Sequence, residues 1–125
     1  MLATDNNAHI DAPQVVTRAF LRAAETLGIS QKTQSQLLGV SEASISRLVK
    51  GTRQVDVDGK EGELALLFIR MYRSLATLLG NEKQRCRAWL EAENIHLGGV
   101  PVELIQHITG LVQVTQYLDA MRGRV

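Results

Sequence analysis

The side chains with the clearest potential for chemistry lie on a polar and cationic face between residues 31 and 50. In such a face, arginine can pair with guanine in the major groove of DNA, serine can contact base edges or phosphate, and lysine can neutralise phosphate. Six basic and two acidic residues fall between residues 12 and 53, whereas the whole chain has a net charge of +1. The candidate DNA-contacting residues are Gln31, Lys32, Ser41, Glu42, Ala43, Ser44, Ser46, Arg47 and Lys50.

These residues divide into base contacts and backbone contacts. We expect Arg47 to pair with guanine and Glu42 to accept a hydrogen bond from a cytosine amino group, although the Glu42 carboxylate also repels phosphate. Gln31, Lys32 and Lys50 are interpreted as contacts to the DNA backbone. The alternative is that the whole set is a solvated polar face on a helical hairpin.

The spacing of apolar residues in the same segment predicts a helix-turn-helix. In the 20 residues that begin at Gln31, the ninth is Gly39, where the turn requires a positive φ. The fifth residue, where the two helices cross closely, is the small Ser35. The fourth, Gln34, departs from the pattern because an apolar residue is usual there. The residues expected to face inward are Leu38, Val40, Ile45 and Leu48.

The sequence predicts an all-α fold, because it has no alternation of apolar and polar residues long enough to indicate a β-strand. Helices are expected over residues 12–27, 31–38, 42–50 and 61–79, and then over a segment capped by Asn81. Two more are expected over residues 101–109 and 111–121, with Gly110 as the break between them. We expect a flexible N-terminus over residues 1–11, a helix-turn-helix domain over 12–58 and a C-terminal domain over 59–125.

The expected helix over residues 61–79 is unusually apolar. Leu64, Phe68, Met71, Leu75 and Leu78 recur at spacings of four and three residues and so share one face. A helix of this kind must be covered, so we expect a central strut packed by both halves of the chain or by a second subunit. The width of its apolar surface is the hint of a homodimer, the usual state of DNA readers of this size.

Several other classes of function find no support in the sequence. The histidines His9, His96 and His107 have no metal-ligand spacing, so no metal site is expected. Cys86, the single cysteine, excludes an internal disulfide and is interpreted as a small buried apolar residue. Without a phosphate-binding loop, a paired-carboxylate site, an export signal or a membrane span, we expect a cytoplasmic protein without enzymatic activity or a cofactor.

Residues 89–123, "WLEAENIHLGGVPVELIQHITGLVQVTQYLDAMRG", resemble the C-terminal domain of the Xre/MbcA/ParS antitoxins. With the helix-turn-helix, the resemblance extends over residues 12–125. It implies an antitoxin of a type II toxin–antitoxin pair that covers the NAD pocket of a RES-domain toxin, an enzyme related to ADP-ribosyltransferases, and represses its own operon. The residues that stand in matching order are Trp89, Leu90, Asn94, Leu97, Gly98, Pro101, Glu103, Leu104, Gly110, Val114 and Leu118.

The tail of the chain is the part for which we hypothesise direct inhibition of that toxin. A pocket for NAD must present cationic or N–H donors to the pyrophosphate, and the Val125 carboxylate can occupy them as an anion, while Arg124 pairs with an acidic catalytic residue. The alternative is a frayed tail. The candidate toxin-binding residues are Trp89, Asn94, Gly98, Pro101, Arg122, Arg124 and Val125.

Some of these residues also have structural interpretations. Trp89 is either a core residue beneath the loop or an exposed interface anchor. Asn94 is expected to bond the loop backbone, and Pro101 to open a helix. Two further functions stay open: a stand-alone repressor whose C-terminal half dimerises or senses a ligand, and a helix-turn-helix that has become a dimerisation scaffold.

Overall fold

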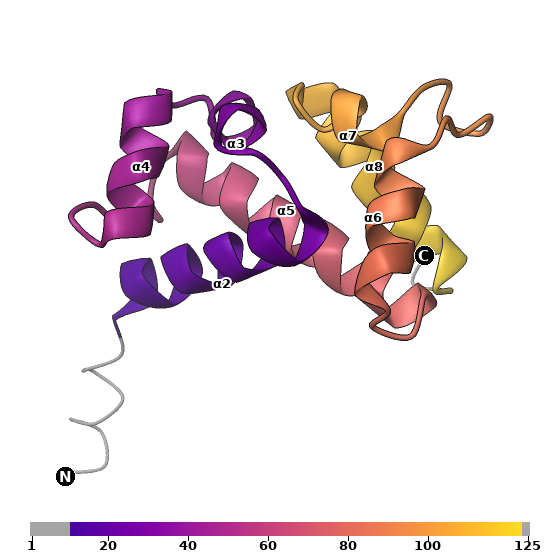
Figure 1. Ribbon diagram of the computed structural model, residues 1–125, viewed down its shortest axis with the longest axis horizontal. Coiled ribbons are helices and arrows are strands. Elements are labelled where there is room, and N and C mark those ends of the chain that lie inside the picture. The colour runs from indigo at the N-terminus through magenta and orange to yellow at the C-terminus, as the bar shows by residue number, and fades with distance from the viewer. Residues whose placement is uncertain (1–10, 124–125) are drawn as a thin grey trace, which may run out of the picture.

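The structure, a computed structural model, describes residues 11–123 (Figure 1). The described residues form helices without a strand, and an isolated β-bridge pairs Asn94 with Gly99. The all-α prediction is therefore confirmed. The helices are α2 (Ala12–Leu27), α3 (Gln31–Leu38), α4 (Glu42–Lys50), α5 (Lys60–Leu78), α6 (Lys83–Glu91), α7 (Pro101–Leu104) and α8 (Ile108–Met121).

The first three helices have the bounds that the sequence predicts, because their ends are set by local caps. The Ser30 hydroxyl accepts from the Thr33 N–H at 3.1 Å at the start of α3, and the Ser41 hydroxyl accepts from the Ser44 N–H at 3.0 Å at the start of α4. Each bond pairs an N–H that the helix itself leaves free. A glycine with positive φ ends each of the three helices.

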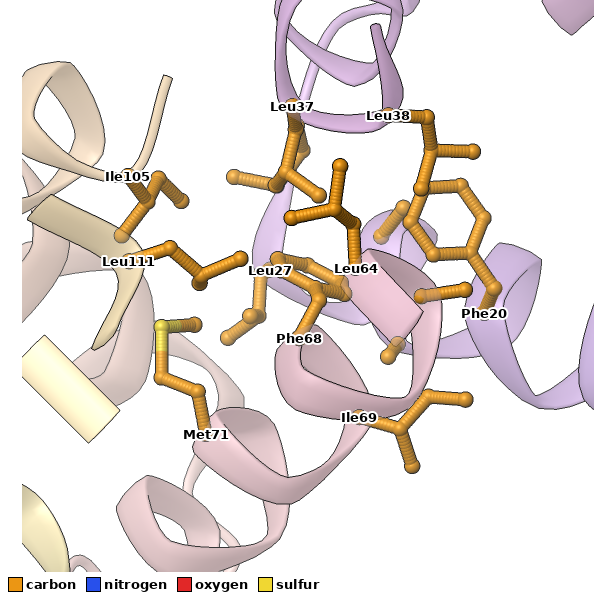
Figure 2. Packing of buried hydrophobic residues seen from close by; sticks show 14 of the residues in the cluster. Phe20, Leu27, Leu37, Leu38, Leu64, Phe68, Ile69, Met71, Ile105 and Leu111 are labelled. Atoms are coloured by element: carbon orange, nitrogen blue, oxygen red, sulfur yellow. The ribbon is translucent and has the colours of Figure 1, made fainter. Parts of the chain in front are cut away.

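Helix α5 is the central element, as its apolar pattern predicts. Phe68 packs against Phe20 of α2 with ring centroids 5.3 Å apart, while Met71 lies on the side of α5 that faces Leu111 of α8 (Figure 2). All four side chains are fully buried, and each contributes roughly 1.5–3 kcal/mol of transfer free energy. One apolar cluster therefore runs through both halves of the chain. The last residue of the predicted face, Leu78, is instead 36% exposed.

The loop between α4 and α5 is held by hydrogen bonds to Thr17 and to Glu61, of which the bond to Thr17 is buried. The Thr17 hydroxyl of α2 accepts from the Val55 N–H at 2.8 Å. The Glu61 carboxylate accepts from the Arg53 guanidinium at 2.9 Å and from the Asp56 N–H at 2.7 Å. Burial raises the pKa of Glu61, but these hydrogen bonds and the charge of Arg53 outweigh burial and lower its pKa below 4.5.

The start of α6 differs from the prediction. Asn81 does not cap the helix, because its φ of 62° places it in the left-handed turn that follows α5. The N-cap is Glu82, whose side chain makes no capping hydrogen bond. Two adjacent residues, Gly80 and Asn81, thus both have positive φ, and the helix starts one residue later than a capping asparagine would require.

The end of the chain also differs from the prediction, in the position of the break. Helix α7 ends at Leu104 rather than at residue 109, and α8 begins at Ile108, so Gly110 lies inside α8. A Cβ on Gly110 would stand 1.9 Å from the Leu104 carbonyl oxygen. The glycine is therefore needed for close packing of α8 against α7 and does not end a helix.

None of the described helices combines the length and the apolar content that crossing a bilayer requires.

Candidate functional surfaces

The pair α3–α4 has the geometry of a helix-turn-helix. Gly39 has a φ of 69°, and its N–H donates to the Ser35 carbonyl at 2.9 Å. Leu38, Ile45 and Leu48 are buried at 2%, 0% and 2% exposure, as predicted, and Val40 is half-buried. The two helices thus meet through the predicted inward face, which leaves the opposite face of α4 to solvent.

Gln34, the one departure from the pattern, is buried because its backbone position faces the core. Its side-chain Nε2 donates to the Ile29 carbonyl at 2.9 Å, so the polar group replaces an apolar contact with a hydrogen bond to the preceding loop. The Oε1 atom of Gln34 is buried without a hydrogen-bond partner among the described residues. The neighbouring Ser35, also buried, donates to the Lys32 carbonyl at 2.7 Å.

The polar face of α4 is arranged around its first turn. The Ser44 hydroxyl lies 3.0 Å from the Ser41 hydroxyl and accepts from Arg47 Nη2 at 3.2 Å. This contact holds the Arg47 guanidinium along the exposed side of the helix, near the N-terminal end. Glu42 is exposed in the same turn, where the helix dipole favours a negative charge.

The remaining candidate DNA contacts lie on the same two helices. Gln31 and Lys32 are exposed in the first turn of α3, and Lys50 is exposed in the last turn of α4. Ala43 is exposed, and Ser46 is half-buried. All nine predicted residues thus belong to α3, α4 or the α4 cap.

In the C-terminal half, three aromatic rings stack beside the loop that joins α6 to α7. Tyr117 of α8 stands between Trp89 and His96, with ring centroids 6.4 Å and 6.1 Å away. Trp89 is half-buried, so one part of it packs and another part faces solvent. Neither ring contact of Tyr117 could be predicted from the sequence, because both depend on how α8 lies against the loop.

The loop itself is built on Asn94, as predicted. The Asn94 N–H donates to the Gly99 carbonyl at 2.9 Å, and its Oδ1 accepts from the Leu97 N–H at 3.1 Å. Gly98 has a φ of 74°, and Pro101 is buried at the start of α7. Among the predicted toxin-binding residues, these three shape the loop.

Arg122 ends α8 next to a polar cluster that the sequence did not indicate. Its Nη1 donates to the Ser74 hydroxyl at 3.0 Å, and that hydroxyl donates to the buried Asp119 carboxylate at 2.6 Å. Asp119 also forms an ion pair with Arg70 of α5. These contacts join residues 45 to 49 positions apart, which no local pattern reveals. Arg124 and Val125 lie outside the described residues.

Cys86 is buried at 1% exposure, as predicted, and burial raises the pKa of its thiol above 9.0. In the described part of the chain, no three His, Cys, Asp or Glu side chains gather closely enough to hold a metal ion. His9 lies outside this part.

Each half of the chain matches the model of a known protein domain family. Residues 8–70 match the profile of the antitoxin Xre-like helix-turn-helix domain. Residues 74–124 match that of the antitoxin Xre/MbcA/ParS C-terminal toxin-binding domain. No curated protein sequence matches the chain. Since the two profiles together extend over nearly all of it, the chain belongs to the Xre/MbcA/ParS antitoxin family, as a helix-turn-helix domain followed by a toxin-binding domain.

Proposed function

We propose that this protein neutralises a cognate RES-domain toxin by binding it and covering its NAD pocket, and that it represses its own operon. The observation that carries the proposal is the order of the two domains, a helix-turn-helix over residues 8–70 and a toxin-binding domain over residues 74–124. A protein with both can hold the toxin and operator DNA at once.

The end of α8 supports a direct role for the tail. The Arg122 N–H bonds to the Leu118 and Asp119 carbonyls, and the Gly123 N–H bonds to the Ala120 carbonyl at 2.9 Å. Together with the bond from Arg122 to Ser74, these contacts hold the point from which the last two residues depart. We propose that Arg124 and Val125 enter the toxin pocket, where Arg124 pairs with an acidic catalytic residue.

The loop and the aromatic stack supply a second part of the proposed toxin interface. Trp89 offers a partly exposed ring of the kind that dominates binding energy in interfaces. Asn94, Gly98 and Pro101 would act by holding the loop in shape and not through contacts of their own. Their substitution is expected to weaken toxin binding through the loop conformation.

The proposal is tested by co-expression with the adjacent toxin gene while growth and cellular NAD are recorded. We expect the full chain to restore both, and deletion of residues 123–125 to reduce that protection while the two proteins still co-purify. Deletion of residues 1–7, which lie outside both matched domains, is the control and should change nothing. Undiminished protection by the tail-deleted protein would refute the tail mechanism, and a harmless toxin candidate would refute the proposal as a whole.

Operator binding is tested with two substitutions on α4. We expect Arg47→Ala to weaken binding by about 1–3 kcal/mol at particular base pairs, and Lys50→Ala to weaken it on all sequences and to reduce the salt slope by about one. Lys60→Ala, an exposed lysine on α5, is the matched control. If both α4 variants bind DNA as the unmodified protein does, the helix-turn-helix is a dimerisation scaffold instead.

We also propose a homodimer, because two half-sites about one helical turn apart are the usual target of such readers. Leu66 of α5 and Ile108 of α8 are 51% and 63% exposed, which leaves apolar surface for a partner. Sedimentation equilibrium would test this, and a monomer at micromolar concentration would contradict it.

The stand-alone repressor is the alternative function. It requires that no RES-type reading frame lies beside the gene and that no co-encoded protein binds the purified chain.

A further inference from the structure

A hollow of about 530 Å³ lies between the second half of α5 and the end of α8. Three arginines line it: Arg70 and Arg73 from α5, and Arg122 from the end of α8. The two helices lie side by side here (Figure 1). The DNA-contacting face of α4 and the loop between α6 and α7 do not line this hollow, but Arg122, one of the predicted toxin-binding residues, does.

Two of the three guanidinium groups are held in place from within the fold. Asp119, 3% exposed, accepts from Arg70 Nη2 and from the Ser74 hydroxyl, and Ser74 in turn accepts from Arg122 Nη1. Because a guanidinium has five N–H groups, each arginine keeps further donors for another acceptor. Arginines that are oriented in this way lose little conformational entropy when they bind a ligand.

The charge of the hollow is strongly positive. Arg73 is exposed and forms no ion pair with any described residue. Of the described residues that line the hollow or contact its arginines, Asp119 is the one carboxylate. Three positive groups therefore face one negative group, and an anion with several oxygens would relieve their mutual repulsion.

The remaining walls suit a ligand larger than a bare anion. The volume falls in the range of roughly 300–1,000 Å³ that is typical of sites for small organic molecules. Leu66 and Ile69 supply apolar surface, and Tyr72 supplies an aromatic ring beside Arg73. Asn81 adds an amide at the edge.

We propose that this hollow binds a phosphorylated small molecule of nucleotide size, whose phosphate groups contact Arg70, Arg73 and Arg122. The organic part of the ligand would lie against the apolar wall and Tyr72. The site adjoins α5, the helix that packs on both the helix-turn-helix and α8.

The test uses the purified full-length protein and calorimetric titration with ADP at constant ionic strength. Adenosine, which has no phosphate, and citrate, a trianion without phosphate, are the matched ligands. We expect ADP to bind with a dissociation constant below about 1 mM, and adenosine and citrate to bind at least tenfold more weakly.

Arg73→Gln is the informative variant, since this exposed side chain has no ion pair among the described residues and its loss should leave the fold intact. It should weaken ADP binding by about tenfold or more, because one charge-assisted contact is lost. Arg18→Gln, an exposed arginine of α2 away from the hollow, should bind ADP unchanged. Equal thermal unfolding midpoints of the two ligand-free variants establish that both are folded.

The proposal is overturned if ADP binds more weakly than about 1 mM, if adenosine or citrate binds as well as ADP, or if Arg73→Gln binds ADP like the unmodified protein. No toxin or DNA takes part in these measurements, so their outcome is independent of the proposed antitoxin function.

Discussion

Replacement of Gly110 by alanine should destabilise the protein, although the same change in an ordinary helix interior is favourable. Gly110 lies in α8, where alanine would normally add about 0.5–1 kcal/mol of stability. Here the new Cβ would stand 1.9 Å from the carbonyl oxygen of Leu104 and 2.7 Å from its carbonyl carbon. Both are backbone atoms, so no side-chain rotation relieves the clash.

The loss of stability in Gly110→Ala can be judged from the residues that must shift to make room for the new Cβ. Separating α8 from α7 shifts Leu104 and the adjacent Ile105, which is 1% exposed in the core. Overpacking of this kind costs about 1–3 kcal/mol, and we place Gly110→Ala at the upper end because the obstacle is backbone. After subtraction of the gain in helix propensity, the net loss is about 2 kcal/mol.

The assay is urea unfolding followed by circular dichroism at neutral pH. Gln116→Ala, at an exposed position of the same helix, is the control and should stay within about 0.5 kcal/mol of the unmodified protein. An unchanged or raised urea midpoint for Gly110→Ala would show that α7 does not constrain α8 as the structure indicates.

Three further predictions concern single side chains. Because the folded-state pKa of Glu61 is lowered, its ionised form stabilises the protein above pH 4.5, and this contribution is lost as the pH falls through the folded pKa. Unfolding midpoints from pH 7 to pH 3 should therefore show that Glu61→Gln is less stable at neutral pH and that its deficit shrinks in acid; a constant deficit would contradict this. Cys86, buried and with a raised pKa, should react with a thiol reagent at pH 8 only after urea unfolding, and rapid reaction of the folded protein would refute its burial. Gly39→Ala should cost about 1–2 kcal/mol through its positive φ alone, since nothing lies within 4 Å of the added Cβ; an unchanged urea midpoint would contradict that origin.

Much of the fold could be predicted because its signals are local. The serine caps before α3 and α4 and the glycines after them act within one helical turn, so α2, α3 and α4 have the predicted bounds. The apolar spacing of α5 likewise predicts its central place. Two predictions were wrong. Asn81 lies in a turn and does not cap a helix, and Gly110 allows a close approach between helices and does not end one.

Of the candidate surfaces, one could likewise be predicted from local sequence and the others could not. The exposed face of α4 follows from the sequence, because the inward positions of a helix determine which residues remain outside. The stack of Trp89 and Tyr117 and the cluster of Arg70, Asp119 and Arg122 could not be predicted, since each joins helices distant in the chain.

The sequence alone therefore determined the all-α class and the helix-turn-helix, because these depend on residue type and spacing within a few turns, whereas the toxin-binding domain was expected from the resemblance to a known family. Only the tertiary structure decided that Gly110 lies inside a helix and that three arginines line one hollow. The physical reason is that close packing brings together backbone atoms and charged side chains from different helices. Such contacts produce no periodic pattern in the sequence.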